Sequence, residues 1–205
     1  MPRHRHKYKM FIRIKFAIHK LLCLKLRLYN MIRKIYIIAL LTFFTTAGFA
    51  QSVTKSTIGF KIKNLGFNVE GTFSGLQADI KFKPADLAGS SIEASVASNT
   101  VNTGSDGRDN HLKNEDYFDV AKYPKITFKS VAFKRKSGSN YTGSFNVTIK
   151  DKTKLIEIPF TYDESGNTAR LKGSFMILRT DFGIGGKNLI LSNEANVTVE
   201  VEISK

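Results

Sequence analysis

Side chains able to do acid–base or metal chemistry gather in one short part of the sequence, residues 108–119, which reads RDNHLKNEDYFD. A histidine beside carboxylates is the combination that general acid–base catalysis and many metal sites use. His111 would be the base, with Glu115, Asp116 or Asp119 as its partner. An enzymatic or metal site here would need further groups from elsewhere in the chain.

Those further groups are scarce. Apart from His111, every histidine and the single cysteine precede residue 51: His4, His6, His19 and Cys23. A zinc site needs about four convergent ligands, and a serine nucleophile of the hydrolase type needs a strained turn such as GxSxG, which the sequence lacks. We therefore predict no catalytic residue, no metal ion and no cofactor.

A structural interpretation accounts better for the same residues. Arg108, Asp109 and His111 are expected to pair with one another or with backbone groups, and so to clamp their segment over one end of the fold. Arg108 and His111 are also the best candidates to contact the polar end of a ligand.

The positive charge of the chain is concentrated at its beginning. The net charge is +15, but residues 1–50 hold 11 Lys and Arg and no acidic residue. Residues 51–205 hold 21 basic and 17 acidic residues, a net charge of +4. A nucleic-acid partner is therefore not expected for this part of the chain.

Residues 31–50 have the three parts of a secretory signal peptide. Arg33 and Lys34 form a charged region, residues 35–46 an apolar run too short to span a bilayer, and Gly48 and Ala50 the small residues of a cleavage site. Cleavage after about Ala50 predicts a periplasmic or secreted protein. Residues 1–30 are then interpreted as a basic extension from a misassigned start.

A period of two dominates the remaining residues, 51–205. Alternating apolar and polar side chains with Gly-, Ser- and Asn-rich turns between them indicate half-buried antiparallel strands in one all-β domain, a sandwich or a closed barrel. The expected strands are TIGFKIK (57–63), ADIKFK (78–83), SIEASVA (91–97), KITFKS (125–130), YTGSFNVTIK (141–150), LIEIPFTY (155–162), LKGSFMI (171–177) and NVTVEVEI (196–203).

One segment departs from this period. Between the strands near Thr100 and Lys125, Asp106 or Asp109 can cap a short helix that runs to about Tyr117. Pro124 then forces an extended residue before the next strand. The charged stretch thus lies on a short helical excursion.

Three stretches of the sequence are characteristic in composition: residues 102–130 (NTGSDGRDNHLKNEDYFDVAKYPKITFKS), 178–186 (LRTDFGIGG) and 59–82 (GFKIKNLGFNVEGTFSGLQADIKF). In these stretches the chain resembles the YceI-like family of exported, lipocalin-like proteins. The resemblance implies an extended eight-stranded antiparallel barrel whose elongated apolar cavity holds a polyisoprenoid or other long-chain lipid. Lys150 and Asp151 stand where Arg and Gly are usual in the family, and we interpret them as a solvent-side change at a turn.

The leading hypothesis is an exported lipid-binding protein that carries or sequesters its ligand. Its rivals are a hydrolase or isomerase of a lipid-like substrate using His111, and a stress-related structural or interaction protein without a ligand. A transient membrane contact and a homodimer are compatible with all three. The residues predicted to contact the ligand are Phe60, Ile62, Phe82, Arg108, His111, Phe128, Phe145, Ile158, Phe160 and Phe175.

Overall fold

The computed structural model describes residues 25–29, 33, 51–187 and 189–205. The predicted basic extension (1–30) and signal peptide (31–50) therefore lie outside the described residues, apart from 25–29 and 33. Residues 49–205 form a compact unit of their own. Among the described residues, no helix is both long and apolar enough to cross a membrane.

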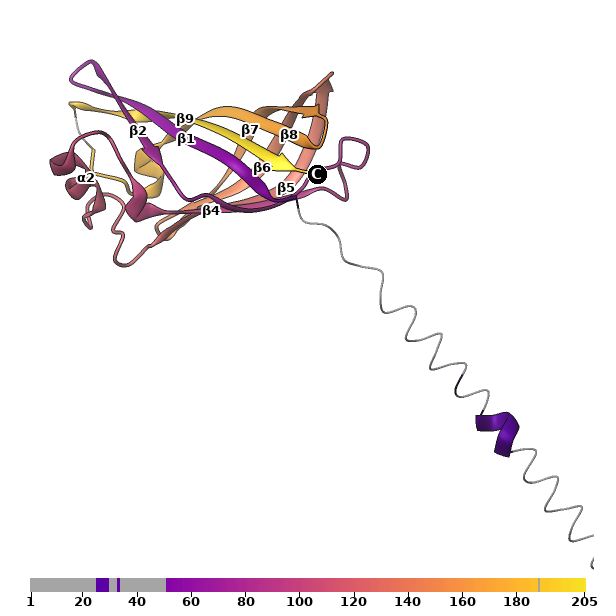
Figure 1. The fold of residues 1–205 in the computed structure, drawn as a ribbon. Coiled ribbons are helices and arrows are strands. Elements are labelled where there is room, and N and C mark those ends of the chain that lie inside the picture. The colour runs from indigo at the N-terminus through magenta and orange to yellow at the C-terminus, as the bar shows by residue number, and fades with distance from the viewer. Residues whose placement is uncertain (1–24, 30–32, 34–50, 188) are drawn as a thin grey trace, which may run out of the picture. The chain divides into compact units, whose positions relative to one another are not determined.

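Within the described residues, nine antiparallel strands form a single sheet that curls into a barrel (Figure 1). Strands that are consecutive in the sequence pair with each other, with the single exception of β2 and β3. In addition, the first strand, β1, pairs with the last, β9. The strands are β1 (Val53–Asn64), β2 (Phe67–Phe73), β3 (Gln77–Lys81), β4 (Ser91–Ala97), β5 (Lys125–Ser137), β6 (Asn140–Ile149), β7 (Lys152–Ser165), β8 (Thr168–Leu178) and β9 (Leu191–Ser204).

The barrel is not closed by a full ladder of backbone hydrogen bonds. Its two edge strands are β2 and β3. Two isolated antiparallel bridges connect the two sides, Gln51 with Ile80 and Thr72 with Asn102. The all-β antiparallel prediction is confirmed, but the expected count of eight strands is wrong.

The strand missing from the sequence prediction is β2. Its inward positions are Val69, Gly71 and Phe73, so a glycine interrupts the apolar alternation. A side chain at Gly71 would overlap the ring of Phe60 on the paired strand β1. The inward space beside Gly71 is filled by that neighbouring ring, which local sequence does not reveal.

Aromatic rings fill the end of the barrel near the β5–β6 turn. Phe82 is buried and its ring contacts Phe133, Tyr141, Phe160 and Tyr162. Phe133 can join this cluster because a β-bulge between Ser130 and Ala132 shifts the register of β5, and the extra residue reverses which positions face inward.

The other end of the barrel is covered by the segment between β4 and β5. This segment contains the 3-10 helix η1 (Ser98–Thr100) and the helix α2 (Asp106–Lys113). The helix is shorter than expected, because Asn114 has extended backbone angles and ends it. A second 3-10 helix, η2 (Arg179–Phe182), follows β8 and lies at the same end (Figure 1).

Candidate functional site: an apolar cavity beneath α2

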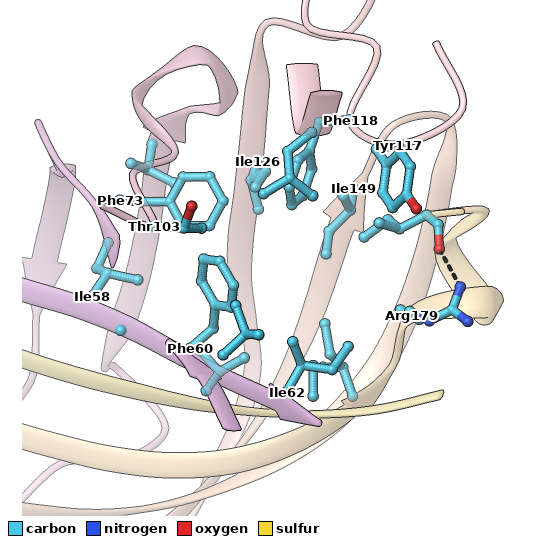
Figure 2. Close-up of a pocket in the computed structure, with 18 of the residues that line it drawn as sticks. Ile58, Phe60, Ile62, Phe73, Thr103, Tyr117, Phe118, Ile126, Ile149 and Arg179 are labelled. Carbon is cyan, nitrogen blue, oxygen red and sulfur yellow. Dashed lines mark hydrogen bonds between the residues drawn. The ribbon is translucent and has the colours of Figure 1, made fainter. Parts of the chain in front are cut away.

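A cavity of about 330 Å³ lies inside the barrel beneath α2. Its walls are the inward positions of several strands, and Figure 2 shows Ile58, Phe60, Ile62, Ile126 and Ile149 around a common space. Residues two apart on one strand point to the same face of a sheet, so the period of two in the sequence produces this apolar wall. The volume lies in the lower part of the range of about 300–1,000 Å³ that small-molecule pockets occupy.

The cover of the cavity is also apolar on its inner side. Leu112 of α2 and the following Tyr117 and Phe118 all line the cavity, and Phe118 is buried. The ring of Phe118 lies edge-on to Phe73 of β2, with 5.5 Å between the ring centroids, and Phe73 lies 5.7 Å from Phe60. These contacts connect the segment after α2 to the edge strand β2 and to β1.

A second, smaller cavity of about 110 Å³ lies farther into the barrel. Ile58, Phe128 and Phe175 line both cavities and therefore separate them. The rings of Phe128 and Phe175 meet edge to face, with centroids 6.2 Å apart. The two cavities lie in series, with the aromatic cluster around Phe82 beyond the inner one.

Thr103 is the point at which α2 is fastened to the chain before it. Asp109 is buried, and one of its carboxylate oxygens accepts hydrogen bonds from the backbone N–H and the hydroxyl of Thr103. Arg108 donates from Nε to the Thr103 hydroxyl (2.7 Å) and from Nη2 to the Thr103 carbonyl (2.8 Å). The predicted clamp therefore exists for Arg108 and Asp109, with Thr103 as their common partner. His111 instead contacts the ring of Tyr117, with centroids 4.7 Å apart.

Arg179 fastens the loop between β8 and β9. It is 3% exposed and its guanidinium donates hydrogen bonds to five backbone carbonyls, at distances of 2.8–3.2 Å. The carbonyls belong to Ile184, Gly185, Gly186, Leu191 and Ser192.

Gly185 permits a close approach of the two covering segments. Its φ of 62° is in the left-handed region, and a Cβ there would lie 3.0 Å from the Tyr117 ring and 3.1 Å from Arg179 Nη1. Its N–H donates to the Asp116 carbonyl at 2.6 Å. Glycine is the residue that fits both constraints.

Lys150 joins the same two segments from the β6–β7 turn. Its Nζ donates to the carbonyls of Glu115 (2.9 Å) and Gly183 (3.2 Å). The interpretation of Lys150 as a solvent-side change is therefore wrong: the side chain connects the segment after α2 to the loop after η2. Sequence reasoning missed this role because both partners are backbone groups distant in the sequence.

Comparison with known proteins gives the same picture of the fold. A family model for the YceI-like domain matches residues 49–204. The chain belongs to the YceI-like family. The resemblance inferred from the sequence motifs is confirmed.

Relatives and structural neighbours of this YceI-like chain come from several bacteria. A UPF0312 protein of Pseudomonas syringae pv. tomato is 30% identical over 136 residues, which are 63% of this chain and 71% of that protein. The crystal structure of Burkholderia cenocepacia BcnA is 26% identical, covers 74% of this chain and 98% of its own, and gives a TM-score of 0.71. A polyisoprenoid binding domain from Saccharophagus degradans is 14% identical, covers 76% and 97%, and gives a TM-score of 0.62, which shows a shared fold.

The structure places the predicted ligand-contacting residues of this YceI-like domain in four groups. Phe60, Ile62, Arg108 and His111 line the outer cavity, and Phe128 and Phe175 line both cavities. Phe82 lines neither and belongs to the aromatic cluster at the far end. The inner cavity alone is lined by Phe145, Ile158 and Phe160.

The polar residues of the outer cavity are cationic or neutral. Its lining contains Arg108, Arg179 and His111, together with Asn64, Thr103 and Tyr117, and no Asp or Glu. Arg108 and His111 are exposed, so the cavity reaches the surface beside α2. Within the described residues, no group of three or more His, Cys, Asp or Glu is placed to hold a metal ion. The arrangement suits an apolar chain with a neutral or anionic polar end.

Proposed function

We propose that this chain is an exported lipid-binding protein that holds a polyisoprenoid or another long-chain apolar molecule in its barrel. The observation that carries the proposal is the pair of apolar cavities in series, with polar side chains gathered at the α2 end of the outer one. Membership of the YceI-like family and the likeness in fold to a domain described as polyisoprenoid binding support it.

Passive burial supplies enough affinity for such a ligand. Each methylene group transferred from water contributes about 0.8 kcal/mol. Ten buried methylenes would contribute about 8 kcal/mol. Binding also costs free energy, because the ligand loses translational and rotational freedom, and the lower estimates of this cost are about 4 kcal/mol. No charged contact is required for binding, and the chain of the ligand determines the affinity.

The polar residues at the α2 end would orient the head group. The exposed Arg108 and His111 stand beside the entrance, and Thr103 and Tyr117 line the cavity next to them. With two arginines and no carboxylate in the lining, an alcohol, carbonyl, carboxylate or phosphate end is favoured over an amine.

An enzyme acting through His111 is the alternative from another class. His111 contacts the Tyr117 ring, but among the described residues no carboxylate forms an ion pair or hydrogen bond with it. A general base is normally oriented by such a partner. Binding is therefore the function that the geometry favours, and His111→Ala should leave ligand uptake intact.

Native mass spectrometry of the exported protein tests the proposal. The full chain is expressed, the processed protein is recovered and its N-terminus is sequenced, with Gln51 expected as the first residue. A co-purifying long-chain molecule, or uptake of an added polyprenol, is expected. An unliganded mass with no uptake of polyprenols or fatty alcohols would contradict the proposal.

A matched pair of variants on β8 locates the bound molecule. Ile177 lines the outer cavity, whereas its neighbour Met176 points outward and is 46% exposed. Ile177→Trp should narrow the cavity and weaken uptake, and Met176→Trp should bind as the unmodified protein does. Equal binding by both variants would place the ligand outside the barrel.

A further inference from the structure

Four large apolar side chains are exposed at the end of the barrel where α2 lies. Leu65 and Phe67 belong to the β1–β2 hairpin and are 68% and 77% exposed, and Leu189 and Ile190 precede β9 and are also exposed. We call these four residues the rim patch. Figure 1 shows the β1–β2 hairpin and the start of β9 at the α2 end of the barrel.

The two parts of the rim patch are joined to each other and to the cavity. The backbone N–H of Leu65 donates to the Ile190 carbonyl at 2.9 Å. The neighbouring residues Asn64 and Leu191 pair across β1 and β9, and both line the outer cavity. The exposed apolar surface is therefore continuous with the wall of the cavity.

The backbone conformation of Leu65 indicates that the exposure of its side chain has a function. Leu65 has a φ of 53° and Gly66 a φ of 81°, so both central residues of the hairpin turn are left-handed. Such turns favour Asn-Gly, and a branched apolar residue in this conformation is unfavourable. Leu65 therefore occupies a strained position without gaining burial. Strain of this kind is characteristic of functional surfaces.

The two stretches of chain that carry the rim patch contain only positive charges, whereas Glu70, Asp181 and Glu194 lie just outside them in the sequence. Residues 62–69 and 182–193 contain Lys63 and Lys187 and no acidic residue. Exposed apolar side chains flanked by lysines are typical of surfaces that insert into an anionic lipid interface. An apolar patch of this kind on a folded domain usually marks an interaction site.

We propose that the rim patch docks the α2 end of the barrel onto an anionic lipid bilayer. Leu65, Phe67, Leu189 and Ile190 enter the interface, and Lys63 and Lys187 lie at the level of the phosphates. The cavity entrance then opens at the membrane, and an apolar chain passes between bilayer and barrel without crossing water. The purpose of docking rests on the proposed lipid cargo, but docking itself is measurable without cargo.

Vesicle flotation with the processed protein tests this inference. Phosphatidylcholine vesicles with and without phosphatidylglycerol are the probes. Binding is expected to the anionic vesicles and to weaken as salt is added. The variant Leu65→Asn/Leu189→Ser should bind about tenfold more weakly, because two inserting side chains become polar. Asparagine is well tolerated at a left-handed position, so Leu65→Asn should not lower the melting temperature.

Leu155→Ser is the matched control. Leu155 lies on β7, is 64% exposed and does not belong to the rim patch. The Leu155→Ser variant should bind vesicles as the unmodified protein does. Absence of flotation with either vesicle, or equal flotation by the rim variant, would overturn the inference. A dimer in light scattering that the rim variant abolishes, without vesicle binding, would assign the patch to a second copy of the chain instead.

The same samples separate this inference from the proposed function. Ligand delivered from ethanol, without vesicles, should still enter the cavity of the rim variant, as native mass spectrometry would show. Flotation without any ligand uptake would refute the lipid cargo and retain the docking surface. Ligand uptake without flotation would refute the docking surface and retain the lipid cargo.

Discussion

Phe128 is expected to limit the length of the chain that the barrel accepts. Its ring and that of Phe175 stand between the cavities of about 330 Å³ and 110 Å³. Phe128→Ala should join them. The inner cavity alone would add room for about four groups the size of a water molecule, at about 30 Å³ each, besides the space that the removed ring leaves. Four more buried methylenes would contribute about 3 kcal/mol, or roughly a 100-fold gain in affinity for a chain long enough to reach them.

The measurement is a displacement titration with n-alkanols of increasing length. For the unmodified protein, affinity should rise with each carbon and then level off when the chain meets Phe128. For Phe128→Ala, the rise should continue for at least about four more carbons before it levels off. The variant should also lose about 3 kcal/mol of unfolding free energy, the lower part of the range for Phe→Ala in a core.

Phe133→Ala provides the control for that loss of stability. Phe133 lies on the same strand, is half-buried as Phe128 is, and contacts the rings of Phe82, Phe145 and Phe160. It lines neither cavity. Its removal should destabilise the fold and leave the length limit unchanged. The reasoning is refuted if the limit is the same in Phe128→Ala and the unmodified protein, or moves equally in both variants.

Two further predictions concern the stability of the fold. Arg179→Met should lower the free energy of unfolding by about 3–5 kcal/mol in urea titrations, because buried carbonyls lose their donor; a loss under about 1 kcal/mol would contradict the clamp. Burial, and then the hydrogen bond to Glu164, raise the pKa of Tyr162 to about 12. The unfolded phenol titrates near pH 10, so this stabilisation is complete below about pH 10 and is lost as the pH rises towards 12. Between about pH 10 and 12, the free energy of unfolding should therefore fall less for Tyr162→Phe than for the unmodified protein. An equal fall with pH in both proteins would disprove the assignment.

The sequence identified the elements whose signal is local. Alternation in residues 141–150 predicted the inward face of β6, where Tyr141, Phe145, Val147 and Ile149 are all buried. The departure from that period located α2, and the motif around it identified the family. Each of these depends on neighbours within a few positions, which a single chain displays directly.

Features that depend on distant contacts escaped the sequence prediction. Strand β2 lacks a continuous apolar face because the Phe60 ring occupies the space beside Gly71. Arg179 and Lys150 bind backbone carbonyls, which every residue possesses, so no pattern of side chains marks their partners. Sequence could not tell Phe82, which lies just after β3 and closes the far end, from Phe128, which separates the cavities, because both occupy inward positions of an alternating apolar pattern.

The sequence by itself therefore determined the class of fold, the inward faces of most strands and the place of the helical break. Only the tertiary structure decided where the barrel is hollow and where it is filled. The physical reason is that alternation assigns a side chain to a face, whereas a cavity depends on how side chains from opposite walls meet. That meeting is set by the curl of the sheet and by the bulge in β5 between Ser130 and Ala132.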